Sequence, residues 1–463
     1  IIFKDFVYIC MLNKIFITMI KRVIEGRILS TLNKKKVVTI IGPRQVGKST
    51  LAAEIIPNDA NILEINGDNT DVQSMFVNVD ETKMKLLIGN KNFLFVDEAQ
   101  KIDNVGNMLK IVAEKFKDVS IIVTGSSAFK LTAAVNESLT GRKREFKLYP
   151  LSFKEMADNS SVLEELRMVD HRLIYGYYPE VVTSPGEEKE VLKEIVDSYL
   201  YKDVMEENNI AKPDKLVKLV KALAFQIGST VSATELAGLV GIDAKTVERY
   251  IEILEKSYII FTLPSYARNQ RNELKFARKL YFWDMGIRNA VIGNMAPISL
   301  RSPEEIGHLW ENFVIAERIK RNEYAGRTFV QHYFWRTQQK KEVDLIEIED
   351  GVMTGFEVKR KERKKVTVPA QFASTYPNAK FQCITPSEVI EFLLEDYVEP
   401  SQSVEPVADN SVGANRGVFS TMPRKEAVVE SKDDEEDGLV ITVEKPEAQT
   451  VDVDNVEMDV YDP

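Results

Sequence analysis

The first residues that could do chemistry form a glycine-bounded loop. Residues 42–49 read GPRQVGKS and fit the pattern GxxxxGK[ST]. They follow the apolar run VVTII and precede STLAAEII, so they join a predicted strand to a predicted helix. Backbone N–H groups of such a loop, together with the helix N-terminus, bind phosphate oxygens. The pattern predicts a nucleotide site at Gly42, Pro43, Arg44, Gln45, Val46, Gly47, Lys48, Ser49 and Thr50.

Two side chains of this loop have distinct expected roles. Lys48 is expected to bridge the β and γ phosphates, and Ser49 is expected to bind Mg²⁺. ATP and Mg²⁺ are therefore the predicted ligand and ion. A chance glycine-rich turn is the alternative, and the flanking strand, the helix and a second motif together argue against it.

That second motif is FLFVDEAQ, a buried strand that ends in two carboxylates. In open α/β sheets the nucleotide lies at the carboxyl ends of the strands. We expect Asp97 to hold Mg²⁺ through water, and Glu98 to orient and deprotonate the attacking water. Two solvated acids that cap a strand would be the simpler explanation.

A third strand, IIVTGSS, brings Thr124 and Ser126 to the same edge, where either could touch the γ phosphate or the water. Further along, LTGRKREF contains Arg142 and Arg144. Arg142 is the stronger candidate for an arginine finger that binds nucleotide, and a basic surface turn is the alternative.

A separate set of acids lies near the other end of the chain. Asp344 in EVDLIEI and Glu357 and Lys359 in TGFEVK match D-x(12)-E-x-K, the pattern of PD-(D/E)xK nucleases, and Glu311 on the preceding helix adds an acid. Asp344, Glu357 and Glu311 are predicted metal ligands, with Lys359 assisting the attacking water. The basic run KRKERKK could hold a nucleic-acid backbone. A solvated strand face with a charged turn would leave the same pattern.

The elements that position these residues fall into several predicted units. Short apolar runs alternate with helical segments from residue 35 to 123, which predicts an α/β domain with a parallel sheet. The segment TELAGLVGIDAKTVERYIEILEKSYII has helix-turn-helix spacing, and a basic turn after it resembles the wing of a winged helix. The candidate phosphate contacts there are Arg249, Arg268, Arg271 and Arg278, although the same arginines could simply solvate a core helix.

Length and composition fit several domains. The 463 residues suffice for about three domains. The two cysteines are too few for a disulfide framework, and a reducing cytoplasm is the expected location. Residues 401–463 hold 16 acidic and 5 basic side chains, leaving a nearly neutral body. We expect this tail to be disordered, to solubilise the chain or, less simply, to dock an unidentified protein.

The first residues, IIFKDFVYICMLNKIFITMIKR, are interrupted by charges, so no membrane span is predicted there. Residues 1–18 are expected to be an upstream extension, with Met11 or Met19 as the start, and a degenerate signal peptide is the alternative.

The order of the motifs resembles one prokaryotic family. GPRQVGKST, FLFVDEAQ, IIVTGSSAF, LTGRKREFKLYPLSF and YGYYPE, then DSYLYKDV, KLYFWDMGIRNAVIG, HLWENFV, EVDLI and FEVK, resemble AAA-type ATP-binding proteins that carry a C-terminal domain of unknown function. The resemblance spans residues 19–394 and implies an AAA+ core, a helical extension, a winged-helix segment and a restriction-endonuclease-like domain. It does not account for the tail.

Together these patterns predict an α/β chain with six segments. The expected segments are an extension at 1–18, a P-loop ATPase core at 19–150, a helical extension at 151–214, a winged-helix-like part at 215–293, a nuclease-like α/β domain at 294–397 and the acidic tail at 398–463.

Two functions remain open at this point. In the first, an ATPase controls a DNA-binding, Mg²⁺-dependent nuclease. In the second, a nucleotide-driven switch or scaffold binds DNA or protein through a catalytically silent nuclease-like domain. A homo-oligomer is compatible with either.

Overall fold

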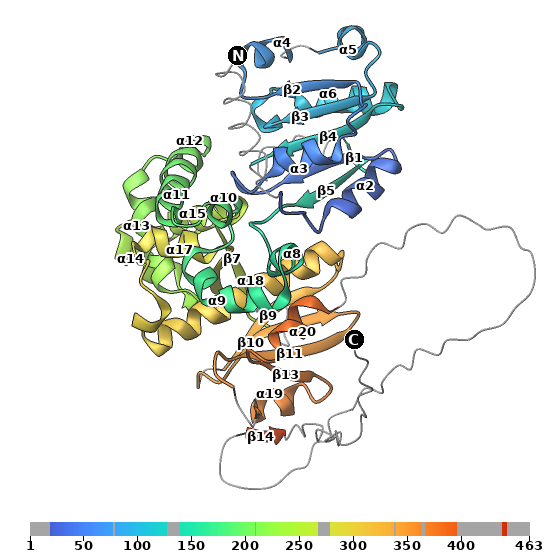
Figure 1. The fold of residues 1–463 in the computed structure, drawn as a ribbon. Coiled ribbons are helices and arrows are strands. Elements are labelled where there is room, and N and C mark those ends of the chain that lie inside the picture. The colour runs from blue at the N-terminus through green and yellow to red at the C-terminus, as the bar shows by residue number, and fades with distance from the viewer. Residues whose placement is uncertain are drawn as a thin grey trace, which may run out of the picture.

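The computed structural model describes residues 19–76, 79–126, 139–208, 210–266, 278–337, 339–362, 366–395 and 438–441. Figure 1 shows a parallel sheet at one end of the molecule, a smaller sheet toward the other end and helices between them. Within the described residues, no helix combines the length and the apolar character needed to cross a bilayer.

The N-terminal sheet has five parallel strands in the order β2-β3-β4-β1-β5. Its central strands are buried apolar runs because helices cover both faces of such a sheet. The predicted α/β class with a parallel sheet is confirmed. The strands are β1 (Val37–Ile41), β2 (Ile62–Asn66), β3 (Phe93–Asp97), β4 (Ser120–Gly125) and β5 (Lys143–Lys147).

Helices connect these strands and bury their apolar sides against the sheet. Helix α6 buries Met108, Leu109 and, one turn further on, Val112. The helices of this part are α2 (Glu25–Asn33), α3 (Lys48–Ile55), α4 (Thr70–Phe76), α5 (Glu81–Ile88), α6 (Val105–Lys115) and the short 3₁₀ turn η1 (Ala99–Lys101).

Helices dominate the middle of the chain. Serine side chains cap three of them: Ser152 forms a reciprocal capping box with Glu155, Ser161 accepts a bond from the Glu164 N–H, and Ser232 accepts one from the Glu235 N–H. The elements are α8 (Phe153–Asn159), α9 (Val162–Tyr175), α10 (Pro179–Thr183), α11 (Glu188–Ile195), the π-helix η2 (Val196–Asp203), α12 (Val204–Glu207), α13 (Pro213–Phe225), α14 (Ala233–Val240), α15 (Ala244–Lys256), α17 (Met285–Ile292) and η3 (Ile298–Leu300).

A small antiparallel sheet lies among these helices, and its strands have the order β6-β8-β7. Its strands are β6 (Thr230–Val231), β7 (Ile260–Pro264) and β8 (Arg278–Phe282). Between β6 and β7 lie α14 and α15, and the turn between these helices contains Gly241 and the N-cap Asp243. We call α13 to α15 together with this sheet the middle module.

The C-terminal part packs a long helix, α18 (Pro303–Ala325), against a mixed sheet in the order β13-β11-β10-β9. Strand β10 pairs antiparallel with β9 and β11, and β11 pairs parallel with β13. The remaining elements are β9 (Gln331–Arg336), β10 (Glu342–Glu349), β11 (Val352–Val358), β12 (Val366–Pro369), α19 (Ala370–Thr375), β13 (Lys380–Ile384) and α20 (Val389–Leu394).

Strand β10 contains a bulge that affects which side chains face α18. Val343 pairs with Trp335, but Ile346 pairs with Tyr333, so three steps on β10 match two on β9. An extra residue in one strand breaks the strict alternation of sides. Asp344 and Glu347, three residues apart, both reach partners outside this sheet: Asp344 contacts Lys279 of β8, and Glu347 contacts Arg318 of α18.

One part of the predicted disordered tail differs from expectation. Residues 438–441 form strand β14 (Gly438–Ile441), which pairs antiparallel with β12. The segment GLVI is an apolar, partly β-branched run inside an otherwise acidic stretch, and such runs favour strand pairing. The rest of the tail and the predicted extension at 1–18 lie outside the described residues.

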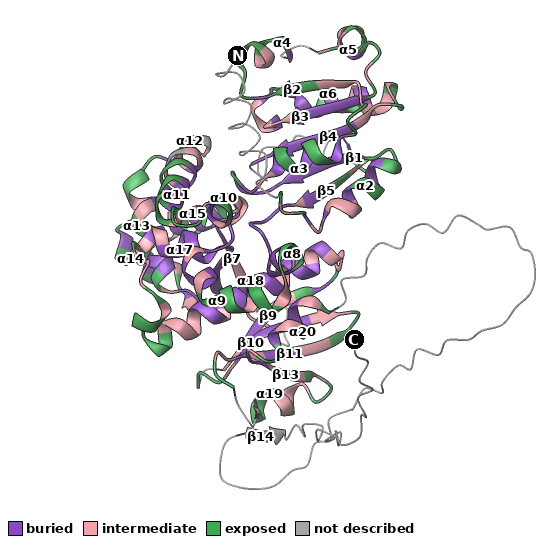
Figure 2. Cartoon of the chain, in the orientation of Figure 1, coloured by how far each residue is buried: buried purple, intermediate pink, exposed green. Residues whose placement is uncertain are grey.

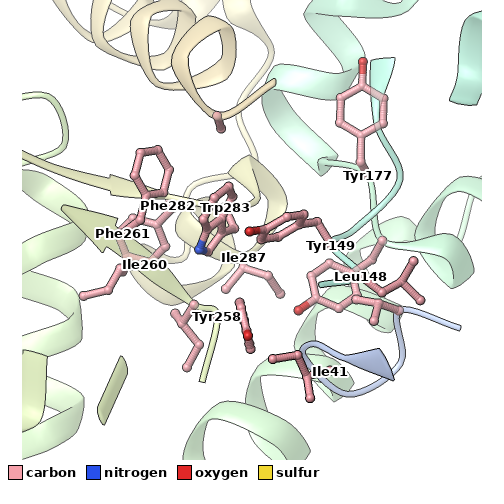
Figure 3. Close-up of a cluster of buried hydrophobic side chains, with 14 of the residues drawn as sticks. Ile41, Leu148, Tyr149, Tyr177, Tyr258, Ile260, Phe261, Phe282, Trp283 and Ile287 are labelled. Carbon is pink, nitrogen blue, oxygen red and sulfur yellow. The ribbon is translucent and has the colours of Figure 1, made fainter. Parts of the chain in front are cut away.

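The parallel sheet and the middle of the chain share an apolar junction. Figure 3 shows Ile41 and Leu148 beside aromatic side chains from several elements. Tyr149 stacks on Trp283 with ring centroids 4.2 Å apart. Buried residues of the sheet strands and of the middle of the chain belong to one hydrophobic cluster, and Figure 2 colours buried residues purple. The junction therefore joins the parts over a shared core.

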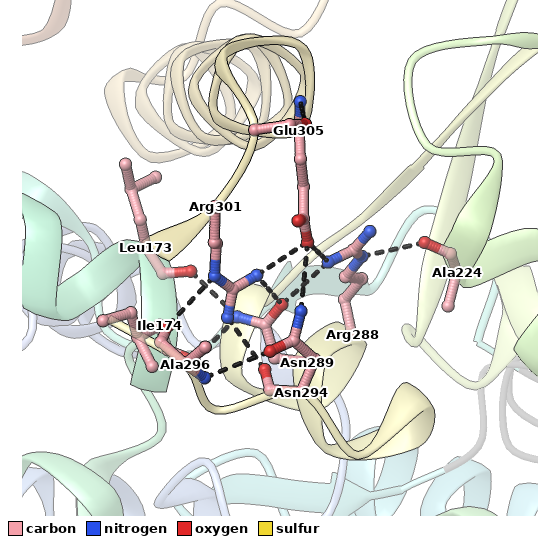
Figure 4. Close-up of polar contacts among 10 residues, drawn as sticks. Leu173, Ile174, Ala224, Arg288, Asn289, Asn294, Ala296, Arg301 and Glu305 are labelled. Atoms are coloured by element: carbon pink, nitrogen blue, oxygen red, sulfur yellow. Dashed lines mark hydrogen bonds and ion pairs between the residues drawn. The ribbon is translucent and has the colours of Figure 1, made fainter. Parts of the chain in front are cut away.

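A buried polar network fixes the base of α17 and α18. Arg288 donates to the Ala224 carbonyl at 2.8 Å, and the Asn289 amide donates to the carbonyls of Leu173 and Ile174 at 2.9 and 2.8 Å (Figure 4). Arg301 and Arg288 both pair with Glu305. These buried polar groups are thus satisfied by partners from several helices.

Candidate functional site

The predicted phosphate loop leaves the end of β1 and enters α3. Gly47, the N-cap of α3, has φ 88°, a left-handed conformation that glycine adopts without strain. A Cβ on Gly42 would lie 2.0 Å from the carbonyl oxygen of Leu148, so only glycine fits beside that chain. Both glycines of the motif are therefore required by the backbone path.

Lys48 is buried in this loop and bonds to the loop itself. Its Nζ donates to the carbonyl oxygens of Gly42 and Pro43 at 3.1 and 2.7 Å. The ammonium therefore lies at the centre of the ring that the loop forms. A phosphate that entered this ring would meet the ammonium and the first N–H groups of α3.

Ser49 and Asp97 meet at the carboxyl ends of β1 and β3. The Ser49 hydroxyl lies 3.0 and 2.9 Å from the two carboxylate oxygens of Asp97, to which it donates. Thr124, at the end of β4, also donates to Asp97. Residues predicted from three separate motifs thus converge at one edge of the sheet.

Glu98 is held beside them in a strained conformation. Its φ of 46° is left-handed, which is costly for a residue with a side chain and often marks functional sites. The Glu98 carboxylate accepts hydrogen bonds from Gln100 at 2.5 Å and from Ser126 at 3.1 Å. The orientation of the acid is therefore fixed before any ligand arrives.

Gln100 was not predicted as a site residue. Its side-chain nitrogen also donates to Ser126 at 2.8 Å, and its buried Oε1 has no hydrogen-bond partner among the described residues. A buried amide acceptor normally finds a partner. The only sequence signal was its place two residues after Glu98, in the turn that continues the motif.

This donor set fits ATP with Mg²⁺. A hydroxyl and a carboxylate in contact are hard oxygen ligands of the kind that Mg²⁺ prefers. The glycine-lined ring, with an ammonium inside it, suits phosphate oxygens. The unsatisfied amide oxygen of Gln100 beside Glu98 leaves an acceptor for one further donor, such as a water molecule.

Two arginines tie the loop to other parts of the chain. Arg44, inside the loop, pairs with Asp203 of η2 at 2.8 Å. Arg22, upstream of α2, is buried and donates to the Val46 carbonyl and the Tyr149 carbonyl, each at 2.7 Å. Arg22 also pairs with Glu155 of α8 at 3.0 Å. Neither contact was predicted, because each partner is remote in sequence.

Arg142 does not join this site within the chain. It lies just before β5, its carbonyl accepts from the N–H of Val37 at the start of β1, and its guanidinium pairs with Glu114 of α6. The loop follows the opposite end of β1. Arg144 is exposed on β5. Within one chain Arg142 is therefore remote from the phosphate loop, because it precedes the parallel strand β5 at the end of the sheet opposite the loop. Its role as an arginine finger stays a prediction.

The C-terminal motif residues do come together. The Lys359 Nζ lies 2.5 Å from a Glu357 oxygen and 3.9 Å from an Asp344 oxygen. The Val358 N–H donates to Asp344 at 2.9 Å. Lys279 Nζ links this cluster to Glu311, lying 2.9 Å from Glu311 and 3.4 Å from Asp344.

The three carboxylates that could hold a metal ion differ in one residue from the predicted ligands Asp344, Glu357 and Glu311. Carboxylate oxygens of Glu311, Glu342 and Asp344 lie within 4.8 Å of one another and could hold a metal ion. Glu342 was not predicted, whereas Glu357 lies on the Lys359 side of Asp344 and is not part of that trio. Hard oxygen ligands suit Mg²⁺ or Mn²⁺. The donor chemistry therefore fits a divalent ion, although the buried ammonium of Lys279 already pairs with these carboxylates.

Electrostatics in this centre reflect burial and crowded charge. Burial, and then the Asp344 charge, raise the pKa of Glu357 to about 7. Burial and Asp344 likewise raise the pKa of Glu311 to about 7, against the opposing effect of Lys279. Burial works against the charge of Lys279, yet the surrounding carboxylates raise its pKa well above the ordinary value. The surrounding carboxylates therefore favour the charged form of Lys279.

The predicted basic contacts of the middle module are partly engaged. Arg278 pairs with Glu248 of α15, and Arg249 donates to the carbonyl of Asn208 at 3.5 Å. Arg268 and Arg271 lie outside the described residues.

Three family models match successive parts of the chain. Residues 34–157 match an AAA domain, residues 166–297 match a domain of unknown function (DUF8612), and residues 306–399 match another domain of unknown function (DUF4143). The first match and the sheet order support an AAA-type P-loop domain in the N-terminal part. The expected AAA domain followed by a C-terminal domain of unknown function is confirmed.

Relatives with similar sequences come from distant prokaryotes. An uncharacterized protein of Mycobacterium tuberculosis is 24% identical over 346 residues, which are 73% of this chain and 74% of that protein. One from Methanocaldococcus jannaschii is 26% identical over 347 residues, covering 70% and 75%. One from Haemophilus influenzae is 26% identical over 305 residues, covering 61% and 74%.

Solved structures show weaker likeness. A Signal Transduction ATPase with Numerous Domains (STAND) protein with a tetratricopeptide repeat sensor, from Pyrococcus horikoshii, is 13% identical with a TM-score of 0.25, over 65% of this chain. This chain spans half the length of that protein. The Drosophila ORC structure, bound to AT-rich DNA and Cdc6, is 10% identical with a TM-score of 0.19, over 57% of this chain and 87% of that one. Scores this low do not establish a shared overall fold.

Proposed function

We propose that this chain binds ATP with Mg²⁺ at the P-loop and hydrolyses it. One observation carries the proposal: Ser49, Asp97 and a pre-oriented Glu98 converge beside the loop that surrounds Lys48. These are the phosphate, metal and water-activating groups that in-line phosphoryl transfer requires.

Each side chain has a distinct task in this proposal. Lys48 exchanges its bonds to loop carbonyls for bonds to phosphate oxygens, which places the terminal phosphate. Ser49 and Asp97 hold Mg²⁺, which neutralises charge on the phosphates when bound. Glu98 takes the proton of the attacking water, while Gln100 and Ser126 fix its carboxylate. Thr124 orients Asp97.

The test separates binding from hydrolysis. Glu98→Gln keeps the shape of the side chain but removes the base, so ATP binding should persist while the rate of hydrolysis falls about 100-fold or more. Glu64→Gln, the same change on an exposed position of β2, is the matched control and should hydrolyse as wild type does. A Glu98→Gln variant that hydrolyses ATP at the wild-type rate would remove Glu98 from the mechanism.

A second proposed function concerns the C-terminal centre: Mg²⁺-dependent cleavage of DNA. The convergence of Asp344, Glu311 and Glu342, with Lys359 beside Asp344, supports it. Helix α18 and the mixed sheet β13-β11-β10-β9 form the α/β unit that carries these residues. The helix pair and β6-β8-β7 sheet of the middle module support a winged-helix contact with DNA.

Plasmid cleavage with Mg²⁺ or Mn²⁺ tests this second function. Asp344→Asn should abolish cutting, while Asp350→Asn, on the exposed turn between β10 and β11, should not. Absence of cutting by wild type, with ATP hydrolysis intact, would favour the alternative of a nucleotide-driven switch that binds DNA or protein through a silent centre.

A further inference from the structure

Lys279 reaches the C-terminal centre from another part of the chain. It lies on β8 of the middle module, and its side chain is 1% exposed. Its Nζ pairs with Glu311 at 2.9 Å, with Asp344 at 3.4 Å and also with Glu342. These are the same three carboxylates that could hold a metal ion.

Other residues of the middle module close the same side of the centre. The Tyr281 hydroxyl, also on β8, donates to Glu311 at 2.7 Å. A Cβ on Gly228 would lie 3.4 Å from a Glu311 carboxylate oxygen, so the chain before β6 passes directly over that acid. The Tyr266 N–H donates to the carbonyl of Phe334 on β9 at 2.7 Å, extending the contact beyond the acids.

One cation excludes the other at this position. Mg²⁺ lies about 2 Å from each of its oxygen ligands. An ion bound by the trio would therefore lie against the ammonium, which is itself within 2.9 to 3.4 Å of two of those acids. Like charges at such a separation, away from water, repel strongly. The acids can be neutralised by Lys279 or by the metal, and not by both.

We propose that Lys279 acts as an intramolecular lock on the C-terminal centre, because its ammonium takes the place of the divalent ion while the middle module is docked. Metal binding then requires Lys279, with β8, to withdraw. This inference rests on the proposed metal-dependent function of the centre, and makes docking of the middle module the step that controls it.

The arrangement of the exposed charges agrees with such a lock. The Lys279 side chain is enclosed, whereas those of Glu357 and Lys359 are 23% and 31% exposed. The motif lysine thus lies at a more open side of the centre, and the module covers Asp344 and Glu311, which are 7% and 12% exposed, more fully than Glu342, which is 24% exposed. Arg336 supports the closed arrangement by donating to Thr230 of β6 at 3.2 Å and pairing with Glu342 at 3.4 Å.

Mn²⁺ binding to the full chain without nucleotide, measured by electron paramagnetic resonance, tests the lock directly. Lys279→Met retains length and removes the charge, and it should raise Mn²⁺ affinity about tenfold or more over wild type. The gain should vanish when Asp344→Asn is added, which separates this centre from the P-loop. Lys320→Met is the matched control, since Lys320 is equally buried but pairs with Glu317.

The outcomes distinguish the lock from the function on which it rests. Equal Mn²⁺ affinity in wild type and Lys279→Met, dependent on Asp344, would overturn the lock while leaving a metal centre. Absence of Asp344-dependent binding in both would overturn the lock and the metal centre together. Tight binding without DNA cleavage would support the lock and count against the nuclease.

A measurement on wild type covers the case in which Lys279→Met does not fold. Saturating Mn²⁺ should increase hydrogen exchange in β8 and β6, because the module must withdraw, and Asp344→Asn should abolish that increase. Mn²⁺ bound at the centre with unchanged exchange in both strands would overturn the proposal.

Discussion

The P-loop site and the C-terminal centre both bring acids and a lysine together, but they assemble them differently. At the P-loop, Lys48, Asp97 and Thr124 stand at the ends of neighbouring parallel strands of one sheet. In the C-terminal centre the acids come from α18, β10 and β11, and a principal counter-charge, Lys279, comes from the middle module.

That difference has a consequence for control. The P-loop lysine bonds to the Gly42 and Pro43 carbonyls of its own loop, and a phosphate group can replace these local bonds. The C-terminal centre must lose an ion pair to another module before a metal can enter. The first site is therefore ready for its ligand, whereas access to the second depends on how the parts of the chain are docked.

The largest expected effect concerns Arg22, a buried charge that links the P-loop to a remote helix. Arg22→Met would leave Glu155 without its buried partner, and loss of one member of such a pair costs about 3–5 kcal/mol. Chemical denaturation measures this change. Lys21→Met, on the exposed neighbour, should change stability by less than about 0.5 kcal/mol. Equal stability of the two variants would break the view that Arg22 anchors the loop.

A somewhat smaller effect on stability is expected at the ion pair between Arg318 and Glu347, both of which belong to the C-terminal part. Arg318 of α18 binds both carboxylate oxygens of Glu347, at 2.9 and 2.8 Å. Glu347→Gln removes the charge but keeps some hydrogen bonds, so we expect a loss of about 3 kcal/mol at neutral pH, measured by denaturation.

The same glutamate should make the domain sensitive to acid. Although burial opposes it, the hydrogen bonds and charges of His332 and Arg318 lower the pKa of Glu347. A carboxyl with a lowered folded pKa stabilises the fold above its unfolded pKa of about 4.3, and this contribution disappears as the pH falls below that value. Unfolding free energies from pH 7 to pH 3 should fall less steeply in Glu347→Gln, and identical slopes would contradict this assignment.

The contact between Arg44 and Asp203 should matter less. Both side chains are partly exposed, and pairs of this kind contribute at most about 1 kcal/mol. Asp203→Asn should therefore change ATP affinity by less than about fivefold, as measured by calorimetry. A larger loss would show that the P-loop also depends on docking, and would remove the contrast between the two sites.

The smallest effect is expected for Arg142→Ala. Arg142 lies at the end of the parallel strands opposite the P-loop and pairs with Glu114. The ATPase rate of the dilute variant should therefore remain within about twofold of wild type. If Arg142→Ala hydrolyses ATP more slowly than wild type only when both proteins are assayed at high concentration, a second copy supplies this arginine.

Sequence reasoning located the P-loop residues because each belongs to a short motif that follows its own strand. Strand order in a parallel sheet then brings Asp97, Thr124 and Ser49 to one edge without further information. The hydrogen bond from Gln100 to Glu98 depends on the left-handed conformation of Glu98. The residue types alone did not indicate that conformation.

The C-terminal centre was only half predictable. The spacing of Asp344, Glu357 and Lys359 brought these residues to one hairpin, but the role of Lys279 depends on packing between parts 65 residues apart in sequence. Lys279 and Tyr281 alternate with Leu280 and Phe282, and this alternation predicts a strand. A single sequence does not show, however, that Lys279 is buried against acids from other elements. The bulge in β10 was equally hidden, because it changes sides without changing composition.

The most direct test of the account is ATP binding and phosphate release by the full chain with Mg²⁺, compared between wild type and Lys48→Ala. The account predicts that wild type binds and hydrolyses ATP, and that Lys48→Ala loses at least about tenfold in affinity together with nearly all turnover, because the ammonium at the centre of the loop is gone. Turnover in Lys48→Ala equal to that of wild type, or no binding by either protein, would contradict it.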